Sequence, residues 1–338
     1  MLYCILSVAV ALSPSMVYML CMRFLQGLAA SGSMAVGGAS IADMFEPKDR
    51  GGAMGLMFLG VLIAPAVAPT IGGALSDAIG WRSIFYAQAV CGILAFFAVL
   101  IGLPETHFPG RPGVKKTVFN PFAAILTLRY LAIFMPALYA GLAFSIFYLY
   151  VTVLPSTFSQ KFGFSSTQNG LVLISAAIGN VIGALVGGRM SDWSRNRMAA
   201  RNGGIALPEY RLPPVWVGAA SFIVGIIGYG WSLQSNLHYI VPIIFLFFNG
   251  IGMMWILTIS SSYTVDAYFW MAGAVSSGTA FFRFLLATIT PNFAVQMDHA
   301  LGDGWTFTVC AIVFAVATLH LIPLQLYGEK LRPKRPEM

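Results

Sequence analysis

The chain has 338 residues, of which 58% are hydrophobic and only 9% are charged, and its formal net charge is +7. A soluble domain usually carries about a quarter charged residues, so this composition excludes an ordinary water-soluble enzyme or binding domain. It predicts a chain whose outer surface faces lipid.

Apolar runs separated by polar loops follow one another along the whole chain. A bilayer core needs about 20 apolar residues per helix. The opening run, 1–12, is little more than half that length, and we interpret it as the outer half of a helix whose beginning is missing. The other runs are long enough to cross, and spans are predicted over 14–42, 52–76, 82–103, 126–154, 168–188, 214–233, 238–263, 269–295 and 305–327.

The second run carries a charge well inside its apolar length. Arg23 is followed by Gln26, Gly27 and Ala30 at helical spacing, so the four share one helix face. A charged side chain within the membrane costs several kcal/mol, so we expect this face to turn toward the bundle interior or a water-filled cavity. The alternative is an arginine that extends to the outer headgroups.

The third run has a stripe of small side chains with prolines beside it. The stripe recurs every four residues and comprises Gly60, Ala64, Ala68 and Gly72, with Pro65 and Pro69 next to it. Small residues at this spacing let two helices approach closely, and prolines bend a helix. We interpret the stripe as a hinge or seal between two moving halves; close packing alone is the alternative.

A long hydrophilic stretch divides the chain. It predicts an incomplete amino-terminal bundle, a cytoplasmic inter-bundle loop, a six-helix carboxy-terminal bundle and a cytoplasmic tail, over 1–103, 104–125, 126–328 and 329–338. With a cytoplasmic amino terminus, the outer loops hold only Arg82 and Lys161, and the cytoplasmic loops hold almost all other basic residues. The positive charge therefore indicates topology, and we expect no nucleic-acid partner.

The second half has one charge near the middle of a span. Arg283 lies within 269–295, and it is interpreted either as a residue of an internal cavity or as a brace between helices. Gly179, Gly183 and Gly187 form another small-residue stripe, for which we favour plain packing.

Residues for enzymatic chemistry are scattered. The four cysteines lie far apart in apolar runs, the histidines do not cluster, and no HExxH, Walker A or GxSxG motif is present. We therefore expect no catalytic residue, no metal site, no cofactor and no enzymatic activity.

Several segments in chain order resemble the major facilitator superfamily. Arg23-Phe24-Leu25-Gln26-Gly27 is similar to its fourth-helix signature, and 64–73 resembles the fifth-helix antiporter motif GxxxGPxxGG, with Ala64 and Ala68 in place of two glycines. Other segments resemble the fungal drug:proton antiporters of twelve spans, namely Ile41–Phe45, Asp49–Gly51, Gly80–Arg82, Leu103–Thr106, Arg201–Gly204, Pro208–Leu212 and Tyr263–Tyr268.

The resemblance implies an all-α integral membrane protein with two pseudo-symmetric helix bundles, alternating access and a binding site near the midplane. It implies a proton-coupled antiporter that exports amphiphilic or cationic small molecules, drugs or metabolites. We expect a monomer in the lipid bilayer of the plasma membrane, with the vacuolar membrane as the alternative. Laid on the family pattern, the chain holds the third to twelfth helices, so its first bundle is incomplete.

The resemblance also assigns roles to residues. It implies proton coupling for Arg23 and Gln26, a cytoplasmic latch for Arg189 and Asp192, and an antiporter hinge for Gly60, Ala64, Pro65, Ala68, Pro69, Gly72 and Gly73. By analogy of fold, the substrate cavity includes Tyr139, Phe144, Tyr148, Asn249, Met253, Trp255 and Arg283. The alternative for the aromatic residues is that they pack in the core or, for Tyr148 and Trp255, anchor at a membrane interface.

A different class of function stays open beside the exporter. The chain is interpreted alternatively as a truncated, non-transporting membrane protein or a remnant of such a transporter, because the first helix of the family normally faces the cavity.

Overall fold

The computed structural model describes residues 1–44, 64, 67–102, 123–268 and 271–332. Every regular element in these ranges is helical, which confirms the all-α prediction. Seven helices of the described part are long and apolar enough to cross a membrane. Two shorter apolar helices, Leu2–Ala11 and Met16–Ser31, precede them.

The chain divides into two compact units. Unit 1 comprises Met1–Thr117 and Phe164–Leu171, and unit 2 comprises Val118–Gly163 and Val172–Met338. The boundary after Thr117 lies inside the loop predicted over 104–125. The first turns of helix α7 (Ser166–Arg201) belong to unit 1, and the rest of this helix belongs to unit 2.

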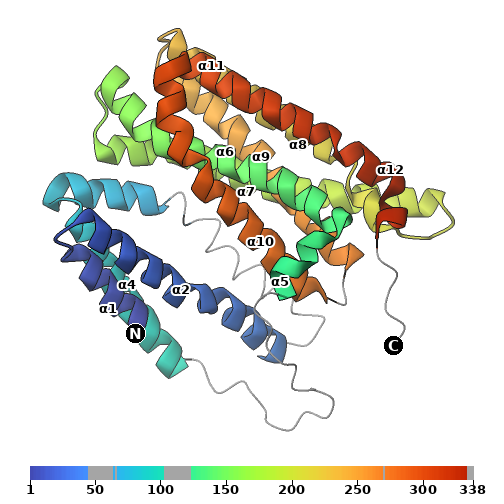
Figure 1. Cartoon of the computed structure of the whole chain (residues 1–338), viewed down its shortest axis with the longest axis horizontal. Coiled ribbons are helices and arrows are strands. Elements are labelled where there is room, and N and C mark those ends of the chain that lie inside the picture. Colours follow the sequence, from blue (N-terminus) through green and yellow to red (C-terminus); the bar gives the residue numbers. More distant parts are fainter. Residues whose placement is uncertain (45–63, 65–66, 103–122, 269–270, 333–338) are drawn as a thin grey trace. The chain divides into compact units, whose positions relative to one another are not determined.

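Unit 1 is built on α1 (Leu2–Ala11), α2 (Met16–Met44), the helical segment 67–79 and α4 (Arg82–Gly102). Helix α1 packs against both α2 and α4 (Figure 1). The Arg82 Nε atom donates to the Ala11 carbonyl oxygen at 3.1 Å, which satisfies an acceptor at the end of α1. The turn between 67–79 and α4 uses Gly80 at a φ of 95°, a conformation that favours glycine.

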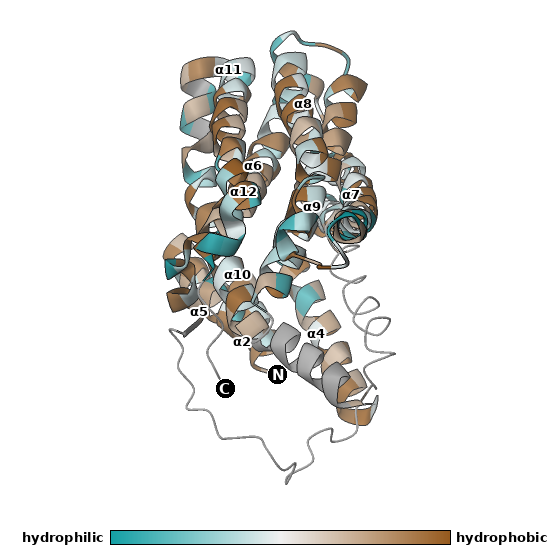
Figure 2. Ribbon diagram, turned by 90° about the vertical axis from the view of Figure 1, so that its right-hand side faces the viewer, coloured by the Kyte–Doolittle hydropathy of each residue, from teal (hydrophilic) through white to brown (hydrophobic). Residues whose placement is uncertain are grey.

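Unit 2 contains the longer helices. After α5 (Ala123–Leu126) come α6 (Leu131–Phe162), the remainder of α7, α8 (Val215–Gln234), α9 (Ile240–Ala267), α10 (Ala272–Ile289), α11 (Pro291–Leu319) and α12 (Leu321–Leu331). Helix α8 packs against α9 and α11, and α6 packs against α9, α10 and α11. Figure 2 shows hydrophobic residues along these helices and hydrophilic residues gathered toward their ends, as a bilayer requires.

Aromatic rings fill the core of unit 2. Tyr139 is fully buried and stacks on Phe314 with ring centroids 4.9 Å apart. Tyr150 is also fully buried, stacks on Phe307 at 4.7 Å and meets the Tyr229 ring edge-on at 4.8 Å. These rings fix α6 against α8 and α11.

Glycines bring α7 and α9 into backbone contact. A Cβ atom on Gly183 would lie 2.9 Å from the Ile251 carbonyl carbon, and one on Gly250 would lie 3.0 Å from that of Ala176. Gly179 meets the backbone of Phe247 in the same way. A Cβ atom on Gly187 would lie equally close to the Trp255 Cα atom, so the interpretation of the stripe Gly179, Gly183 and Gly187 as close packing is confirmed.

One helix is much longer than its predicted span. Helix α7 continues to Arg201 instead of ending near 188, because no glycine or proline interrupts its polar extension before Gly203 and Gly204. These two glycines have φ values of 67° and 85°, and the Gly204 N–H donates to the Ala199 carbonyl at the helix end. The span predicted over 269–295 is confirmed by the apolar stretch Ala272–Ala294, within which α10 ends at Ile289 and α11 begins at Pro291.

Candidate functional site

A polar network joins the helices of unit 1. The Arg23 Nη1 atom donates to Gln26 Oε1 at 3.1 Å, and Gln26 Nε2 donates to Ser7 Oγ at 2.7 Å and to Gln88 Oε1 at 3.5 Å. The Arg23 guanidinium also lies 5.2 Å from the centroid of the Phe85 ring. Gln26 is 2% exposed, so the network links α2 to α1 and α4 through a buried amide.

The network confirms that Arg23 and Gln26 lie on one helix face. Arg23 makes no ion pair with a described residue, so its charge is compensated by an amide and an aromatic ring only. Ser7 and Gln88 were not singled out from the sequence. Their polarity within apolar runs was the available signal, but nothing local placed them next to Gln26.

The segment 64–73, which resembles the antiporter motif, comes closest to the start of α7 along one helix face. A Cβ atom on Gly73 would lie 2.7 Å from the Ser166 carbonyl carbon, and one on Gly170 would lie 2.5 Å from the Pro69 carbonyl oxygen. A Cβ atom on Gly72 would meet only the Ile84 side chain at 3.9 Å, an ordinary contact. The tight face is therefore that of Pro69 and Gly73, one residue away from the predicted stripe.

The structure describes only some of the remaining residues of the predicted hinge. Ala64 and Ala68 lie in helical backbone and Ala64 is exposed, whereas Gly60 and Pro65 lie outside the described residues. The hinge role stays a prediction for all seven residues.

Asp77 extends the tight face by one more helical turn from Gly73. Its carboxylate accepts hydrogen bonds from the backbone N–H groups of Ser166 and Thr167, at 3.2 and 2.8 Å, and from Thr167 Oγ1 at 2.7 Å. Asp77 is thus an N-cap for α7 supplied by a distant segment. The Thr167 hydroxyl and the backbone N–H groups hold the pKa of the Asp77 carboxyl well below its usual range.

We predict that Asp77→Asn weakens the cap of α7, because the amide has one acceptor oxygen where the carboxylate has two. A lowered pKa in the folded state means that the carboxylate stabilises the cap above its ordinary pKa of about 3.9 and loses this effect only as the pH falls toward the folded value. Amide exchange at Ser166 and Thr167 should therefore be faster in the variant at pH 7. The variant and the parent should converge in strongly acidic buffer, and unchanged exchange at pH 7 would contradict the cap.

A charged cluster of unit 2 surrounds Arg211. Its Nη1 atom donates to Asp192 at 2.5 Å and its Nε atom donates to Asp266 at 2.6 Å, while Arg195 lies 3.7 Å from the same Asp266 oxygen. Hydrogen bonds to the two carboxylates raise the pKa of Arg211 despite its partial burial. The cluster connects α7, η2 (Pro208–Arg211) and α9.

The structure pairs Asp192 with Arg211 and not with Arg189. Arg189 forms no ion pair with a described residue, so the expectation that Arg189 and Asp192 act together has no contact to support it. Asp192 remains in a candidate latch whose basic member is Arg211. The sequence pattern missed Arg211 because it lies 19 residues further along the chain.

Arg211→Gln and Arg189→Gln should differ clearly in stability. The first change leaves Asp192 and Asp266 without their shared cation, and we expect a loss of about 1–3 kcal/mol of unfolding free energy. The second change removes no described ion pair and should cost under about 0.5 kcal/mol. Thermal unfolding of the two purified variants measures the difference. Equal destabilisation would show that the ion pairs of Arg211 with Asp192 and Asp266 do not stabilise the fold.

The predicted cavity residues separate into two groups. Tyr139, Asn249, Met253 and Trp255 are buried in the core, where Asn249 Nδ2 donates to Tyr150 Oη at 3.2 Å and Trp255 Nε1 donates to the Pro214 carbonyl at 3.0 Å. Phe144 and Tyr148 are more exposed, and their ring centroids lie 4.9 Å apart. A role of either group in binding substrate stays a prediction.

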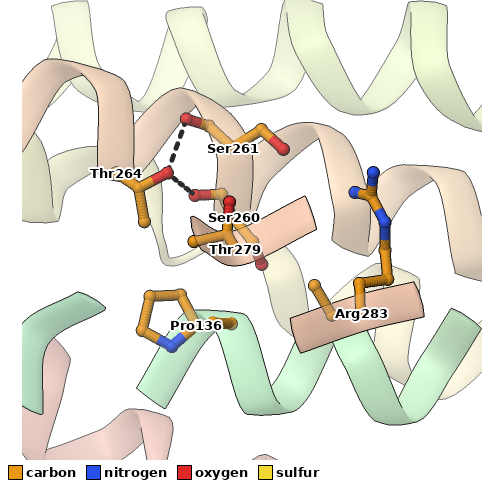
Figure 3. A pocket seen from close by; sticks show the side chains of 8 residues that line it. Pro136, Ser260, Ser261, Thr264, Thr279 and Arg283 are labelled. Atoms are coloured by element: carbon orange, nitrogen blue, oxygen red, sulfur yellow. Dashed lines mark hydrogen bonds between the residues drawn. The ribbon is translucent and has the colours of Figure 1, made fainter. Parts of the chain in front are cut away.

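Arg283 lies beside the second group and lines a pocket of unit 2. Its guanidinium is 5.1 Å from the Phe144 ring centroid and 5.5 Å from that of Phe284. Figure 3 shows the Arg283 side chain extending from α10 toward α9, where Ser260 and Ser261 lie. Arg283 Nε is buried and has no hydrogen-bond partner among the described residues.

Among the described residues, no group of three or more histidine, cysteine, aspartate or glutamate side chains has the geometry to hold a metal ion.

Comparison with known proteins gives one consistent result. A model of the Major Facilitator Superfamily matches residues 1–291. The chain is 33% identical to the MFS-type transporter penM of Penicillium rubens, across 98% of this chain and 70% of the relative. It is 32% identical to the efflux pump radE of Floropilus chiversii, across 98% of this chain and 66% of the relative.

Solved structures show the same fold. A bacterial homologue of the human lysosomal transporter Spinster, in an inward-facing and occupied conformation, matches with a TM-score of 0.69 at 15% identity, over 99% of this chain and 82% of that chain. The inward-facing, unoccupied form of this homologue matches with a TM-score of 0.65. The chain thus spans about two thirds of the length of radE and most of the solved homologue.

Proposed function

Because this chain belongs to the major facilitator superfamily and is a multi-pass membrane protein, we propose that it is a proton-coupled antiporter for amphiphilic small molecules. The observation that carries this proposal is the Arg23–Gln26–Ser7–Gln88 network of unit 1. A permanent charge within apolar helices is costly and rarely kept without a task.

Arg23 acts in this proposal through its electric field. A guanidinium does not release its proton at physiological pH, so Arg23 is not itself the proton carrier. A nearby positive charge instead favours the ionised form of an acidic group that approaches it. We propose that Arg23, oriented by Gln26, promotes proton release from such a group during the transport cycle.

The direction of transport and the class of cargo are proposed from two features. The relative radE is called an efflux pump, and we extend outward transport to this chain. Phe144, Tyr148 and Phe284 form an aromatic wall beside Arg283, with the Phe144 and Phe284 centroids 5.5 Å apart. Such a wall suits drugs or metabolites with an apolar body.

Cellular accumulation tests the proposal. The chain would be expressed in a yeast host whose own drug exporters are deleted, and the retention of a fluorescent rhodamine ester and of dansylglycine would be followed. We expect lower retention of at least one dye than in cells that express Arg23→Met, and a protonophore should remove the difference. Retention of both dyes equal to that of host cells without the chain would contradict transport by this chain.

The setting of the protein is part of the same proposal. We propose a monomer in the plasma membrane, with the vacuolar membrane as the alternative. Imaging of a fluorescent carboxy-terminal fusion in the same host distinguishes the two membranes.

A further inference from the structure

We propose that the pocket beside Arg283 binds an anionic oxygen group, in particular the carboxylate of an amphiphilic cargo. This inference rests on the proposed function and narrows its substrate class to acids with an apolar body. It concerns unit 2 alone, because Arg283, Ser260, Ser261 and Thr264 all belong to that unit.

The charge of Arg283 has no counter-ion among the described residues. Arg283 lies near the middle of α10, in a segment apolar enough to cross a membrane. Its near neighbours are the Phe144 and Phe284 rings, which offset only part of the cost of placing a guanidinium there. Its Nε atom is buried without a described partner. An incoming anion would supply the missing acceptor.

Serine hydroxyl groups of α9 line the pocket beside Arg283 and add hydrogen-bond donors to those of the guanidinium. The Ser260 and Ser261 side chains form no hydrogen bond with a described residue, and both line the pocket together with Arg283. The Thr264 hydroxyl already donates to the backbone carbonyls of Ser260 and Ser261, at 3.0 Å each (Figure 3). Two free hydroxyl donors and a guanidinium together match the acceptors of a carboxylate.

The shape of the pocket fits a group and not a whole drug. The enclosed part of the pocket has room for about one water-sized group, and the rest of its space is open to solvent. Sites for drug-sized ligands usually measure about 300–1,000 Å³. Pro136, Ala137 and Ala140 of α6 form an apolar side. Phe144 and Tyr148 lie one and two helical turns further along α6, where the apolar body of the same ligand would rest.

The charge of the pocket disfavours a cation. No carboxylate is among the described residues that line it, and Arg283 would repel an ammonium group brought into the same space. A lipophilic cation would then have to bind elsewhere in the protein.

Binding of matched aromatic probes tests the pocket without any transport assay. The full chain would be placed in phosphatidylcholine nanodiscs and titrated calorimetrically with 2-naphthoate, 2-naphthamide and 2-naphthylmethylammonium. We expect the acid to bind at least tenfold more tightly than the amide, and the ammonium to bind more weakly than the amide. Comparable binding of all three probes, or no binding of the acid, would overturn the proposal.

Variants identify the residues. Arg283→Met should remove the advantage of the acid over the amide, and Ser260→Ala with Ser261→Ala should reduce it about three- to tenfold. Arg129→Met is the matched control, because Arg129 contacts Tyr130 outside the pocket. The serine variant keeps the test valid if Arg283→Met does not fold. If Arg283→Met and the double serine variant both bind the acid as tightly as the parent, these residues do not form the anion site.

Two further experiments are needed. One distinguishes a lipid headgroup from a soluble acid as the natural ligand, and the other distinguishes a failure of the proposed function from a failure of the anion site. If a lipid headgroup is the natural ligand, adding phosphatidylserine to the nanodiscs should weaken naphthoate binding to the parent and not to Arg283→Met. If a soluble acid is the natural ligand, the lipid should have no such effect. Either result supports the anion site. Loss of transport with intact acid binding would count against the proposed function and not against the pocket.

Discussion

Gly73→Leu is expected to destabilise unit 1 severely, whereas Gly72→Leu is expected to be tolerated. A Cβ atom on Gly73 would lie 2.7 Å from the Ser166 carbonyl carbon and 2.9 Å from the Thr167 Cα atom. These are backbone atoms, which cannot move aside without displacing the start of α7. Overpacking usually costs about 1–3 kcal/mol, and a backbone clash places this variant at or above the upper end.

Gly72 is the internal control for this experiment. Its Cβ atom would contact only the end of the Ile84 side chain at 3.9 Å. Thermal unfolding of both purified variants should give a much lower midpoint for Gly73→Leu than for Gly72→Leu. The opposite order would mean that the small-residue face read from the sequence, and not the Pro69–Gly73 face, makes the close contact.

Arg23→Met is expected to reduce proton-coupled transport more than tenfold while the protein stays folded. The change removes the charge but keeps a long apolar side chain against the Phe85 ring. Gln26 would lose its donor from Arg23 and keep its hydrogen bond to Ser7, so the helix packing should survive. Transport is measured as gradient-driven substrate flux, and folding is measured by thermal unfolding and by elution as a single species.

Two further variants make the result specific. Gln26→Leu leaves the charge but removes its orienting partner, and we expect an intermediate loss of coupled transport. Arg189→Gln removes a basic residue that has no described ion pair, and transport should be unchanged. Parental transport by Arg23→Met would contradict the role assigned to this arginine.

Sequence reasoning was correct for features that a single helix determines. Arg23 and Gln26 lie three positions apart on one helix, and their hydrogen bond follows from helical periodicity. Gly179 and Gly183 pack closely because repeated small residues on a helix leave room for a neighbour. The number of long spans in the second half also followed from hydropathy alone.

The residues that were missed have distant partners. Asp77 meets Ser166 and Thr167 across about 90 residues of chain, and Gln26 meets Gln88 across 62. Arg211 joins Asp192 to Asp266, which lie on two different helices. Hydropathy and periodicity describe single helices, so they do not determine which faces of two helices meet. The shift from Gly72 to Gly73 has the same cause.

The polar extension of α7 shows a further limit of composition. The segment after 188 is rich in arginine and reads as a loop by hydropathy, yet it is helical to Arg201. On this extension, Asp192 accepts a hydrogen bond from Arg211, and Ser194 donates one to the Tyr210 carbonyl. These tertiary contacts support a helix that hydrophobicity does not predict. The end of the helix, in contrast, follows from Gly203 and Gly204.

Proton flux in reconstituted vesicles tests the central claim most directly. The chain would be inserted into liposomes that contain a pH-sensitive dye, an inward or outward proton gradient would be imposed, and 2-naphthoate or a rhodamine ester would be added. We predict that protons move down their gradient while the substrate moves in the opposite direction. The internal pH should change accordingly, and this change should be absent in Arg23→Met vesicles. Vesicles in which no substrate moves, or in which substrate moves without any proton movement, would contradict proton-coupled antiport by this protein.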